Sequence, residues 1–452
     1  MPTMTLDRAG LRAPFTGTDG ERVGLEVEAG LVDAETGRSL PYEGPNGTGA
    51  LITAIAEDAE QFGERATVVA EDGNPLAVDF GAGDRFSLEM GGALEYSSSV
   101  HNGVDAAVAH TGRRLRQAAR VAATMNAAVL SGGYLPFTPP ENIPWVPKGR
   151  LAIMRHHFLE GGEHPGLISA SMGLTLSTQV TLDYLDEDDL AEKLWAINLA
   201  SPVVAAMFAN SPLESGGFEG YLSKRLQAIQ HTDTDRFGIL PFAVSSPPTV
   251  DEIVDWALTH PMIFREEGEG YIPAPDIAFA EALATGFGDG TFPNAGDWDA
   301  HLDQLWPYVR VRNTLEIRIC DGPFWRQIGT VPAFWSGLLY HRPSRLAALD
   351  LLAGLSHADL QATAVQVTTH GLKAKVGDRS AGDLCRELLA LSERGLAARV
   401  RAGAEAPGTP RLLSPLWNVV RTGKTSAERG LARWRGEFGQ SPAEYVRAHR
   451  IR

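Results

Sequence analysis

Four segments of the chain alternate apolar and polar residues with a period of two, and this pattern constrains the fold most strongly. The segments are RVGLEVEAGLV, RFSLEMGGALEYSSS, GLTLSTQVTLDYL and RNTLEIRICDG. Successive side chains of a β-strand point to opposite faces, so each segment predicts a half-buried strand. Strand segments lie close together or flank tight turns such as Gly91-Gly92, and helical segments lie between others. We therefore expect an α+β fold with antiparallel sheet rather than a doubly wound parallel sheet.

The polar sides of these strands are rich in carboxylates. They carry Glu26, Glu28, Glu89, Glu95 and Glu316, together with Gln179 and Arg318. Any single strand could belong to a sheet with one ordinary solvated face, and this alternative stays open. Clustered carboxylates repel one another, however, so five of them on one sheet would need a compensating cation. Oxygen-only ligands suit Mg²⁺ or Mn²⁺, and Arg318 would then be placed to stabilise a transferring phosphoryl group.

Two further segments carry basic side chains suited to an anionic substrate. WVPKGRLAIMR contains Lys148, Arg150 and Arg155, and GYLSKRLQAIQHTDTDRFG contains Arg225. Arginine binds a carboxylate through two parallel hydrogen bonds, so these residues are candidates for holding an amino acid. Each could equally be a surface charge, and the sequence leaves that alternative open. Neither GxxxxGK[ST] nor a GxGxxG that follows a strand is present, so cofactor-binding residues stay unknown.

The 452 residues show no internal repeat and no low-complexity linker, which favours one large domain. We expect residues 1–20 to form a flexible N-terminal extension and residues 21–452 to form a single catalytic domain, with a helical part from about residue 340. Helical periodicity predicts helices at residues 104–128, 187–209, 345–355, 381–402 and 426–438. Residues 132–149 and 268–298 are expected to be loops because of their glycine and proline content.

Charge and cysteine content narrow the partners and the compartment. The chain has 40 Lys and Arg against 56 Asp and Glu, a formal charge of −16, which disfavours nucleic acid as a partner. No basic segment precedes an apolar stretch at the start, and no run of about 18 apolar residues occurs, so we expect neither secretion nor a membrane partner. The two cysteines, Cys320 and Cys385, exclude a disulfide framework and favour a cytoplasmic location. The oligomeric state, monomer or homodimer, stays open.

The motifs as a set resemble those of the glutamate–cysteine ligases of the plant and proteobacterial type. The matching segments, in the family's order, are GLEVE, SLEMGGALEYS, PKGRLAIMR, QVTLD, FANSP, DTDRFGILPF and LEIRICDGPFW. The resemblance runs from about Val23 to about Tyr445. It implies a glutamine-synthetase-like catalytic fold with a curved, mainly antiparallel sheet flanked by helices. It also implies an enzyme that uses ATP and Mg²⁺ to phosphorylate the γ-carboxylate of L-glutamate and joins it to the amine of L-cysteine.

The resemblance further implies a role for each matching residue. Glu316 and Arg318 would be catalytic, with Arg318 stabilising the pentacoordinate phosphorus, and Arg155 and Arg225 would hold the substrate glutamate. The metal ligands would be Glu26, Glu28, Glu89, Glu95 and Glu316, with Gln179 beside them. The product, γ-glutamylcysteine, would supply glutathione synthesis or, in organisms that lack glutathione, ergothioneine synthesis.

The chain departs from the family pattern near the expected amino-acid pocket. Where the family has SMRSHIW, residues 223–229 read SKRLQAI, so Gln227 and Ile229 replace a histidine and a tryptophan. Other differences are at Thr181, Met90, Ile319 and Cys320. Exchanging a large aromatic side chain for isoleucine changes the shape of a pocket and therefore its specificity. The alternatives are a ligase of the same chemistry with a different amine or acid in a specialised biosynthetic pathway, and a catalytically silent homologue.

Overall fold

The computed structural model describes residues 6–81, 83–160, 162–268 and 270–452. Its main sheet consists of β1 (Val23–Asp33), β2 (Thr67–Glu71), β3 (Asn74–Asp79), β4 (Arg85–Leu88), β5 (Leu94–Ser97), β6 (Ala127–Leu130), β7 (Thr178–Asp183), β12 (Val309–Val311) and β13 (Thr314–Ile317). Short pairs outside it are β8 (Phe237–Gly238) with β11 (Trp306–Pro307), β9 (Phe264–Glu267) with β10 (Gly270–Pro273), and β14 (Lys375–Val376) with β15 (Arg379–Ser380).

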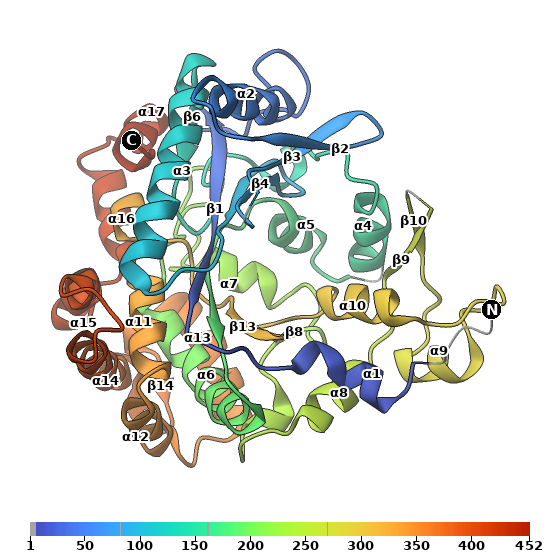
Figure 1. The fold of residues 1–452 in the computed structure, drawn as a ribbon. Coiled ribbons are helices and arrows are strands. Elements are labelled where there is room, and N and C mark those ends of the chain that lie inside the picture. Colours follow the sequence, from blue (N-terminus) through green and yellow to red (C-terminus); the bar gives the residue numbers. More distant parts are fainter. Residues whose placement is uncertain (1–5, 82, 161, 269) are drawn as a thin grey trace.

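The main sheet has nine strands in the order β12-β13-β7-β1-β5-β4-β3-β2, and β6 pairs with the second half of β1 (Figure 1). Its strand pairs are antiparallel. The four segments with period-two alternation form β1, β4 with β5, β7 and β13. The predicted α+β fold with a mainly antiparallel sheet is therefore confirmed.

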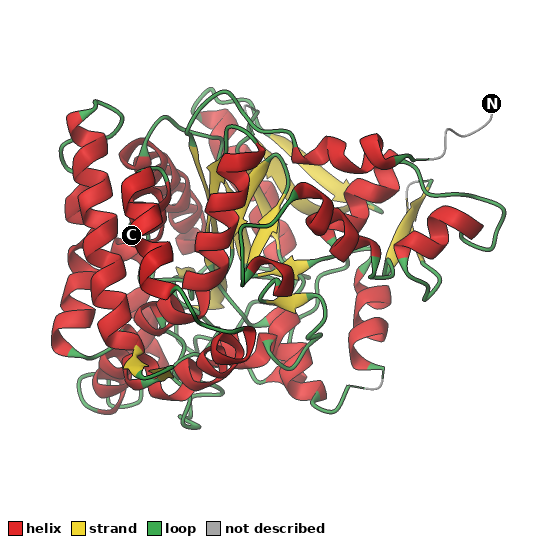
Figure 2. Ribbon diagram, turned by 90° about the horizontal axis from the view of Figure 1, so that it is seen from below, coloured by secondary structure: helices red, strands yellow, loops and turns green. Residues whose placement is uncertain are grey.

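Helices pack around this sheet (Figure 2), and those of the C-terminal part gather on one side of it (Figure 1). The helices are α1 (Arg8–Arg12), α2 (Thr48–Gln61), α3 (Val104–Thr124), α4 (Leu151–Leu159), α5 (Pro165–Gly173), α6 (Glu187–Phe208), α7 (Lys224–Ile229), α8 (Val250–Leu258), α9 (Phe279–Thr285), α10 (Ala295–Asp303), α11 (Thr330–Leu339), α12 (Arg342–Leu352), α13 (His357–His370), α14 (Ala381–Arg401), α15 (Ser414–Thr422), α16 (Ser426–Arg435) and α17 (Pro442–His449).

The apolar side of the central strands forms the core. Leu25 of β1, Val180 of β7 and Leu315 of β13 are buried in one cluster with side chains of α6, α11 and α14. Because strand side chains alternate, burying these residues directs the intervening polar ones to the opposite face. The helices therefore fix which face of the sheet remains available for a site.

Most of the predicted helices are present, with shifted ends. The helices predicted at 187–209 and 381–402 are α6 and α14 to within one residue. The helix predicted at 104–128 stops at Thr124, because Asn126 adopts a φ of 56° and residues 127–130 instead pair with β1 as β6. The helix predicted at 345–355 begins three residues earlier, with Pro343 in its first turn, where the missing amide proton costs nothing.

The segment 268–298 is not the long loop that its glycine content predicted. Residue 269 lies outside the described residues, but Gly270–Pro273 forms β10, Phe279–Thr285 forms α9, and α10 begins at Ala295. Phe279 and Ala282, one helical turn apart, are buried and hold α9 against the core. The glycine content of the segment predicts a loop, whereas the two buried apolar residues favour the helix that forms.

The N-terminal segment also differs from the flexible extension that was expected. Residues 1–5 lie outside the described residues, but the segment is packed from there on. Leu11 and Phe15 are buried, and Arg8 forms ion pairs with Asp251 and Asp255 of α8. Leu11 and Phe15 therefore hold the N-terminal segment against the hydrophobic core that includes residues of α6 and α8.

Candidate functional site

Strand register brings the predicted carboxylates onto one face of the sheet. Glu28 of β1 lies directly across from Glu95 of β5, and Glu26 lies across from Gln179 of β7. The next strand, β13, pairs with β7 so that Glu316 joins the same face. Residues directly opposite each other in an antiparallel pair have neighbouring side chains. The polar sides of the four predicted strand segments thus form one surface.

Three of these carboxylates are close enough to share one cation. Oxygen atoms of Glu26, Glu28 and Glu95 lie within 4.8 Å of one another, and we call these residues the three-carboxylate group. Burial raises the pKa of all three, and repulsion from neighbouring carboxylates raises it further, to about 7 for Glu95. A divalent cation would remove this repulsion, and the all-oxygen donor set suits Mg²⁺ or Mn²⁺. The group therefore fits the cation that the sequence predicts.

Glu89 borders the three-carboxylate group and lies outside it. It precedes a tight turn in which the Gly92 amide donates to the Glu89 carbonyl (2.9 Å). Gly92 has a φ of 82°, and a Cβ on Gly91 would lie 2.0 Å from the carbonyl oxygen of Gly173, so both turn positions require glycine. After burial, the charge of Glu89 is the next cause of the raised pKa of Glu95. The turn thus adds a fourth carboxylate beside the group.

A hydrogen-bonded chain connects the three-carboxylate group to Arg318. Gln179 donates through Nε2 to Glu28 Oε1 (3.1 Å) and accepts through Oε1 from Arg318 Nη1 (2.7 Å). Arg318 also forms an ion pair with Glu316. Burial would lower the pKa of Arg318, but the charges of Glu316 and Glu26 outweigh burial and raise it. Arg318 is therefore a fixed positive charge beside the candidate cation site.

Arg310 is a neighbour of the site that the sequence reasoning missed. It lies across from Glu316 in the β12–β13 hairpin, and its Nη1 is 3.4 Å from Glu316 Oε1. Burial would raise the pKa of Glu316, but Arg310 and Arg318 outweigh burial and lower it. Glu316 thus stays ionised between two arginines and is not part of the three-carboxylate group. The alternation in VRVRNTLEIR carries the signal, because a turn at Arg312 places Arg310 opposite Glu316.

A small pocket of about 130 Å³ opens beside these residues. Its charged lining consists of Glu28, Glu89, Arg225 and Arg318. The remaining lining is mainly apolar and includes Met154, Phe158, Met172 and Trp306. An arginine close to a cation-binding carboxylate can orient a small molecule that carries both an anionic and a reacting group. The small pocket can therefore hold an amino acid next to the candidate cation site.

Arg225 is fixed in the small pocket by the start of α7. Its guanidinium donates to the carbonyls of Arg318 (2.8 Å) and Ile319 (3.1 Å). Ser223, the N-cap of α7, donates to the buried carboxylate of Asp321 (2.9 Å). The sequence analysis does not single out Asp321, although it lies shortly after Arg318 and the end of β13, the strand that carries Glu316. It positions Arg225 by holding the first turn of α7.

The other predicted basic residues lie in the segment 148–155, outside the lining of the small pocket. Burial lowers the pKa of Lys148, and the charge of Glu89 opposes that effect. Arg150 is the N-cap residue of α4. Arg155 lies over the ring of Trp145, 4.5 Å from the centroid, and its buried Nε has no hydrogen-bond partner among the described residues. Of the four predicted substrate-binding residues, only Arg225 belongs to the described lining of the small pocket.

Plant enzymes are among the proteins most similar to this chain. The chloroplastic glutamate–cysteine ligase of Arabidopsis thaliana is 34% identical over 426 residues, which cover 94% of this chain and 78% of that protein. The chloroplastic enzyme of Brassica juncea is 33% identical over 432 residues, with the same coverage. Among solved structures, the glutamate–cysteine ligase of Francisella tularensis in complex with AMP matches with a TM-score of 0.56, over 96% of this chain and 88% of that one. Its sequence is 11% identical, so this match supports the fold alone.

These relatives correct one expectation from the sequence. A cytoplasmic location was predicted, whereas the relatives from Arabidopsis thaliana, Brassica juncea and Nicotiana tabacum are chloroplastic enzymes. The prediction is wrong because a low cysteine count bears on the redox state of a compartment and does not identify the compartment. No helix in the described part of the chain is both long and apolar enough to cross a membrane.

A family model matches nearly the whole chain. The model of glutamate-cysteine ligase family 2 covers residues 22–446, which include the three-carboxylate group, Gln179, Arg225 and Arg318. The match spans the sheet, the small pocket and most of the C-terminal helices, so it is not restricted to one motif. The chain belongs to glutamate-cysteine ligase family 2.

Proposed function

We propose that the protein is an ATP-dependent ligase that joins the γ-carboxylate of L-glutamate to the amine of L-cysteine, giving γ-glutamylcysteine, ADP and phosphate. The observation that carries the proposal is the three-carboxylate group, connected through Gln179 to Arg318 at the small pocket that contains Arg225. Phosphoryl transfer depends mainly on positioning and charge stabilisation, and these groups supply both. Residues 21–452 would act as one catalytic domain.

Arg318 is the group proposed to act in the first step. A γ-carboxylate oxygen of glutamate forms a bond to the γ-phosphorus of ATP, the bond from that phosphorus to the bridging oxygen breaks, and ADP leaves. The guanidinium of Arg318 stabilises the charge on the transferring phosphoryl group. Glu316 and Gln179 hold this guanidinium from two sides, so it is oriented before the substrates bind. Arg225 binds the α-carboxylate of glutamate.

Glu26, Glu28 and Glu95 would hold Mg²⁺ or Mn²⁺, and Glu89 and Glu316 are the remaining predicted ligands. When bound, the cation would neutralise the phosphates of ATP and polarise the phosphoryl group. The raised pKa values of the three-carboxylate group support this assignment, because burial and, after it, repulsion among the carboxylates disfavour their charged forms, and a bound cation would offset both. An uncompensated group of this kind would repel both ATP and glutamate.

The apolar lining of the small pocket is proposed to protect the intermediate. In the second step the amine nitrogen of cysteine bonds to the carbonyl carbon of the acyl phosphate, the bond from that carbon to the phosphate oxygen breaks, and the proton lost by the amine passes to phosphate or water. Acyl phosphates react readily with water, so the reaction requires a site from which water is excluded. Met154, Phe158, Met172 and Trp306 provide such a lining.

The test measures ADP release from ATP in the presence of Mg²⁺ and L-glutamate, with and without L-cysteine, and the mass of the product. ADP release that needs both amino acids, together with the mass of γ-glutamylcysteine, supports the proposal. Removing divalent cations with a chelator should stop the reaction, and Mg²⁺ or Mn²⁺ should restore it. Absence of ADP release with any combination of acid and amine would contradict the ligase assignment.

A second candidate is a ligase of the same chemistry that uses a different amine or acid in a specialised biosynthetic pathway. One observation favours a different amine. Ile229, which replaces the tryptophan of the family motif, lines the small pocket and also a larger cavity next to it. In the same assay, ADP release with another amine well above that with cysteine would establish this candidate.

A further inference from the structure

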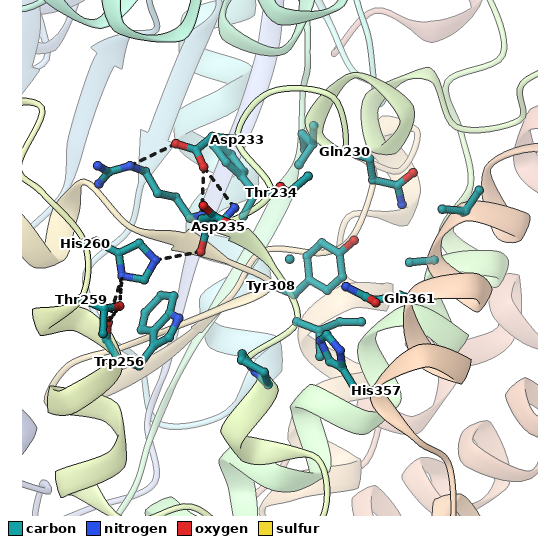
Figure 3. Close-up of a pocket in the computed structure, with 18 of the residues that line it drawn as sticks. Gln230, Asp233, Thr234, Asp235, Trp256, Thr259, His260, Tyr308, His357 and Gln361 are labelled. Carbon is teal, nitrogen blue, oxygen red and sulfur yellow. Dashed lines mark hydrogen bonds and ion pairs between the residues drawn. The ribbon is translucent and has the colours of Figure 1, made fainter. Parts of the chain in front are cut away.

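A cavity of about 780 Å³ adjoins the small pocket. Figure 3 shows residues that line this cavity. We call it the large cavity; residues 233–239, the end of α8 and the first half of α13 form most of its walls. Ile229 and Phe237 line the large cavity, the small pocket and a minor pocket that reaches Arg225 and Arg318. The large cavity and the small pocket therefore lie on two sides of the same pair of side chains.

Ile229 and Phe237 form a partition between the large cavity and the small pocket, and Ile229 is the smaller of the two side chains. Phe237 is fixed by stacking on Trp306, with ring centroids 5.2 Å apart and an interplanar angle of 18°. Phe158 packs edge-on against Trp306 with ring centroids 5.6 Å apart. Trp306 is therefore held in place and in turn supports Phe237. Ile229 is the last residue of α7 and is aliphatic. A tryptophan at this position, as in the family motif, would occupy space that isoleucine leaves open between the two compartments.

Aromatic rings and hydrogen-bonding side chains lie next to one another in the lining of the large cavity. In Figure 3, Trp256 and His260 lie on one side and Tyr308 and Gln230 on the other. The rings of Trp256 and His260 pack with centroids 4.7 Å apart. Gln230 Nε2 is buried and finds no hydrogen-bond acceptor in the described part of the chain. These features suit a flat, partly polar ring, because aromatic side chains pack well against other rings.

Asp233 and Arg236, two of the charged residues that line the large cavity, form an ion pair with each other. Asp233 lies 3.1 Å from Arg236 Nε and accepts from the Asp235 amide (3.1 Å). The Asp235 carbonyl accepts from His260 Nε2 (3.0 Å). A buried charge that already has a partner contributes little further attraction to a charged ligand. The large cavity is therefore better suited to an uncharged ring than to a second anion such as a carboxylate.

We propose that the large cavity is an acceptor subsite, and that the enzyme transfers the γ-glutamyl group to an amine that carries an aromatic or heteroaromatic side chain. The inference rests on the proposed function, because an acyl phosphate in the small pocket is what such an amine would attack. The amine nitrogen reaches the carbonyl carbon past Ile229, and the ring lies among Phe237, Trp256 and Tyr308. Phosphate leaves and the amine loses a proton, as with cysteine. The volume of the cavity lies within the range of sites that enclose whole small molecules.

The experiment compares acceptors and variants in the complete assay with ATP, Mg²⁺ and L-glutamate. The acceptors are L-cysteine, L-phenylalanine, L-tryptophan and phenethylamine, and product masses identify which of them is joined. Ile229→Trp closes the partition, and Val365→Trp fills the outer end of the large cavity at a position that is 60% exposed, where folding is not at risk. Ala362→Trp is the matched control, since Ala362 is exposed on the same helix and does not line the cavity.

We expect the wild type to join at least one aromatic amine to glutamate in addition to cysteine, giving a product mass that identifies that amine. The ratio of kcat/KM for the best aromatic amine to that for cysteine should fall about tenfold or more in Ile229→Trp and Val365→Trp, and stay unchanged in Ala362→Trp. Products with cysteine alone would overturn the inference and leave the proposed function in place. A rise in the KM for ATP in Val365→Trp, equal for all acceptors, would also overturn it by assigning the large cavity to the nucleotide. No ADP release with any amine would overturn both.

Discussion

The carboxylate-bearing face of the sheet and the wall of the large cavity meet near Arg225 and Ile229, and they are built in opposite ways. On the sheet face, register alone sets the distances, because Glu28 and Glu95 are cross-strand partners and can move apart only if the strands slip. The wall of the cavity combines the segment 233–239, the end of α8 and part of α13, and its loop residues tolerate exchange of side chains. We infer that the side chains of the sheet face carry out the phosphoryl transfer, and that the side chains of the cavity wall determine which amine is the acceptor.

The positions that differ from the family motifs follow the same division. Gln227 and Ile229 lie on α7, at the junction of the two regions, and Gln227 Oε1 is buried without a hydrogen-bond partner among the described residues. The carboxylates of the sheet face and Arg318 all match the family pattern. If the division is correct, substitutions on the sheet face should reduce turnover with every acceptor, and substitutions in the cavity wall should change selectivity.

Arg318→Ala should cause the largest loss. Among the described residues, Arg318 is the one guanidinium linked both to Gln179 and to Glu316, so its removal leaves the developing charge of the phosphoryl group without its stabilising partner. We expect kcat to fall by about 10⁴-fold with every acceptor. ATP binding, measured by calorimetry, should remain detectable. Arg326→Ala, at an exposed position of the same segment, is the control and should retain activity. Turnover unchanged in Arg318→Ala would remove Arg318 from the mechanism.

Glu95→Gln should cause the next largest loss, by a different route. The substitution keeps the shape of the side chain but removes one charged ligand from the three-carboxylate group. We expect kcat to fall by about 10³-fold and the Mg²⁺ concentration needed for half-maximal rate to rise. The same variant should be more stable than the wild type without divalent cations, because it relieves repulsion. Glu43→Gln, at an exposed carboxylate, should change neither quantity. A normal Mg²⁺ requirement in Glu95→Gln would argue against a cation at this group.

The sheet face could be predicted from the sequence because period two is a short-range pattern that survives folding unchanged. Alternation of Glu26 and Glu28 with buried neighbours placed both on one face without knowledge of any partner strand. Arg310 and Asp321 were missed for the opposite reason. Arg310 acts through a cross-strand partner and Asp321 through the N-cap of α7, which lies about a hundred positions away in the chain. The pairing of Arg310 follows only if the alternation is continued across the turn at Arg312, whereas the contact of Asp321 depends on tertiary packing, which alternation does not encode.

The cavity wall was less predictable than the sheet face. Its aromatic residues come from β8, from α8 and from the residue between β11 and β12, segments with no common pattern in the sequence. The same limitation explains the wrong loop assignment for residues 268–298, where one buried helical pair decides the structure. In the sequence, Ile229 is visible only as a departure from a motif. In the structure it lies between the large cavity and the small pocket.

Asp321→Asn should reduce activity less than the two substitutions on the sheet face. Its effect should reach the small pocket through α7, the helix at the junction of the two regions. Asp321 accepts from the Asn210 amide (2.9 Å) and from the hydroxyls of Ser211 (2.7 Å) and Ser223 (2.9 Å). An asparagine places a donor where an acceptor is needed, which should reduce the free energy of unfolding by about 1 to 3 kcal/mol. Because α7 carries Arg225, the KM for glutamate should rise more than the KM for ATP. Asp350→Asn, at an exposed position, is the control. Equal changes in both KM values would contradict a specific role in positioning Arg225.

The smallest predicted effect concerns the response of the two regions to acid. His301 of α10 packs behind the wall of the large cavity, where its Nε2 donates to the Ala257 carbonyl (2.9 Å) and its ring stacks on Phe279. Burial lowers the pKa of His301 to about 3, and its buried Nδ1 has no hydrogen-bond partner among the described residues. The unfolded chain therefore binds a proton below about pH 6.5 that the folded chain does not bind. This contribution to stability is complete above that pH and is lost progressively as the pH falls towards 3.

His301→Phe isolates this contribution, because phenylalanine can stack on Phe279 and does not titrate. The stability of the wild type relative to the variant, measured by urea unfolding, should decrease by about 2 kcal/mol between pH 8 and pH 5. The carboxylates of the sheet face are present in both proteins, so their contribution to the pH dependence cancels in the difference. Their raised pKa values act in the opposite sense, because they stabilise the cation-free folded state as the pH falls. A difference that does not change with pH would mean that His301 is protonated in the folded protein, so that the helical wall and the sheet face no longer differ in the sign of their response.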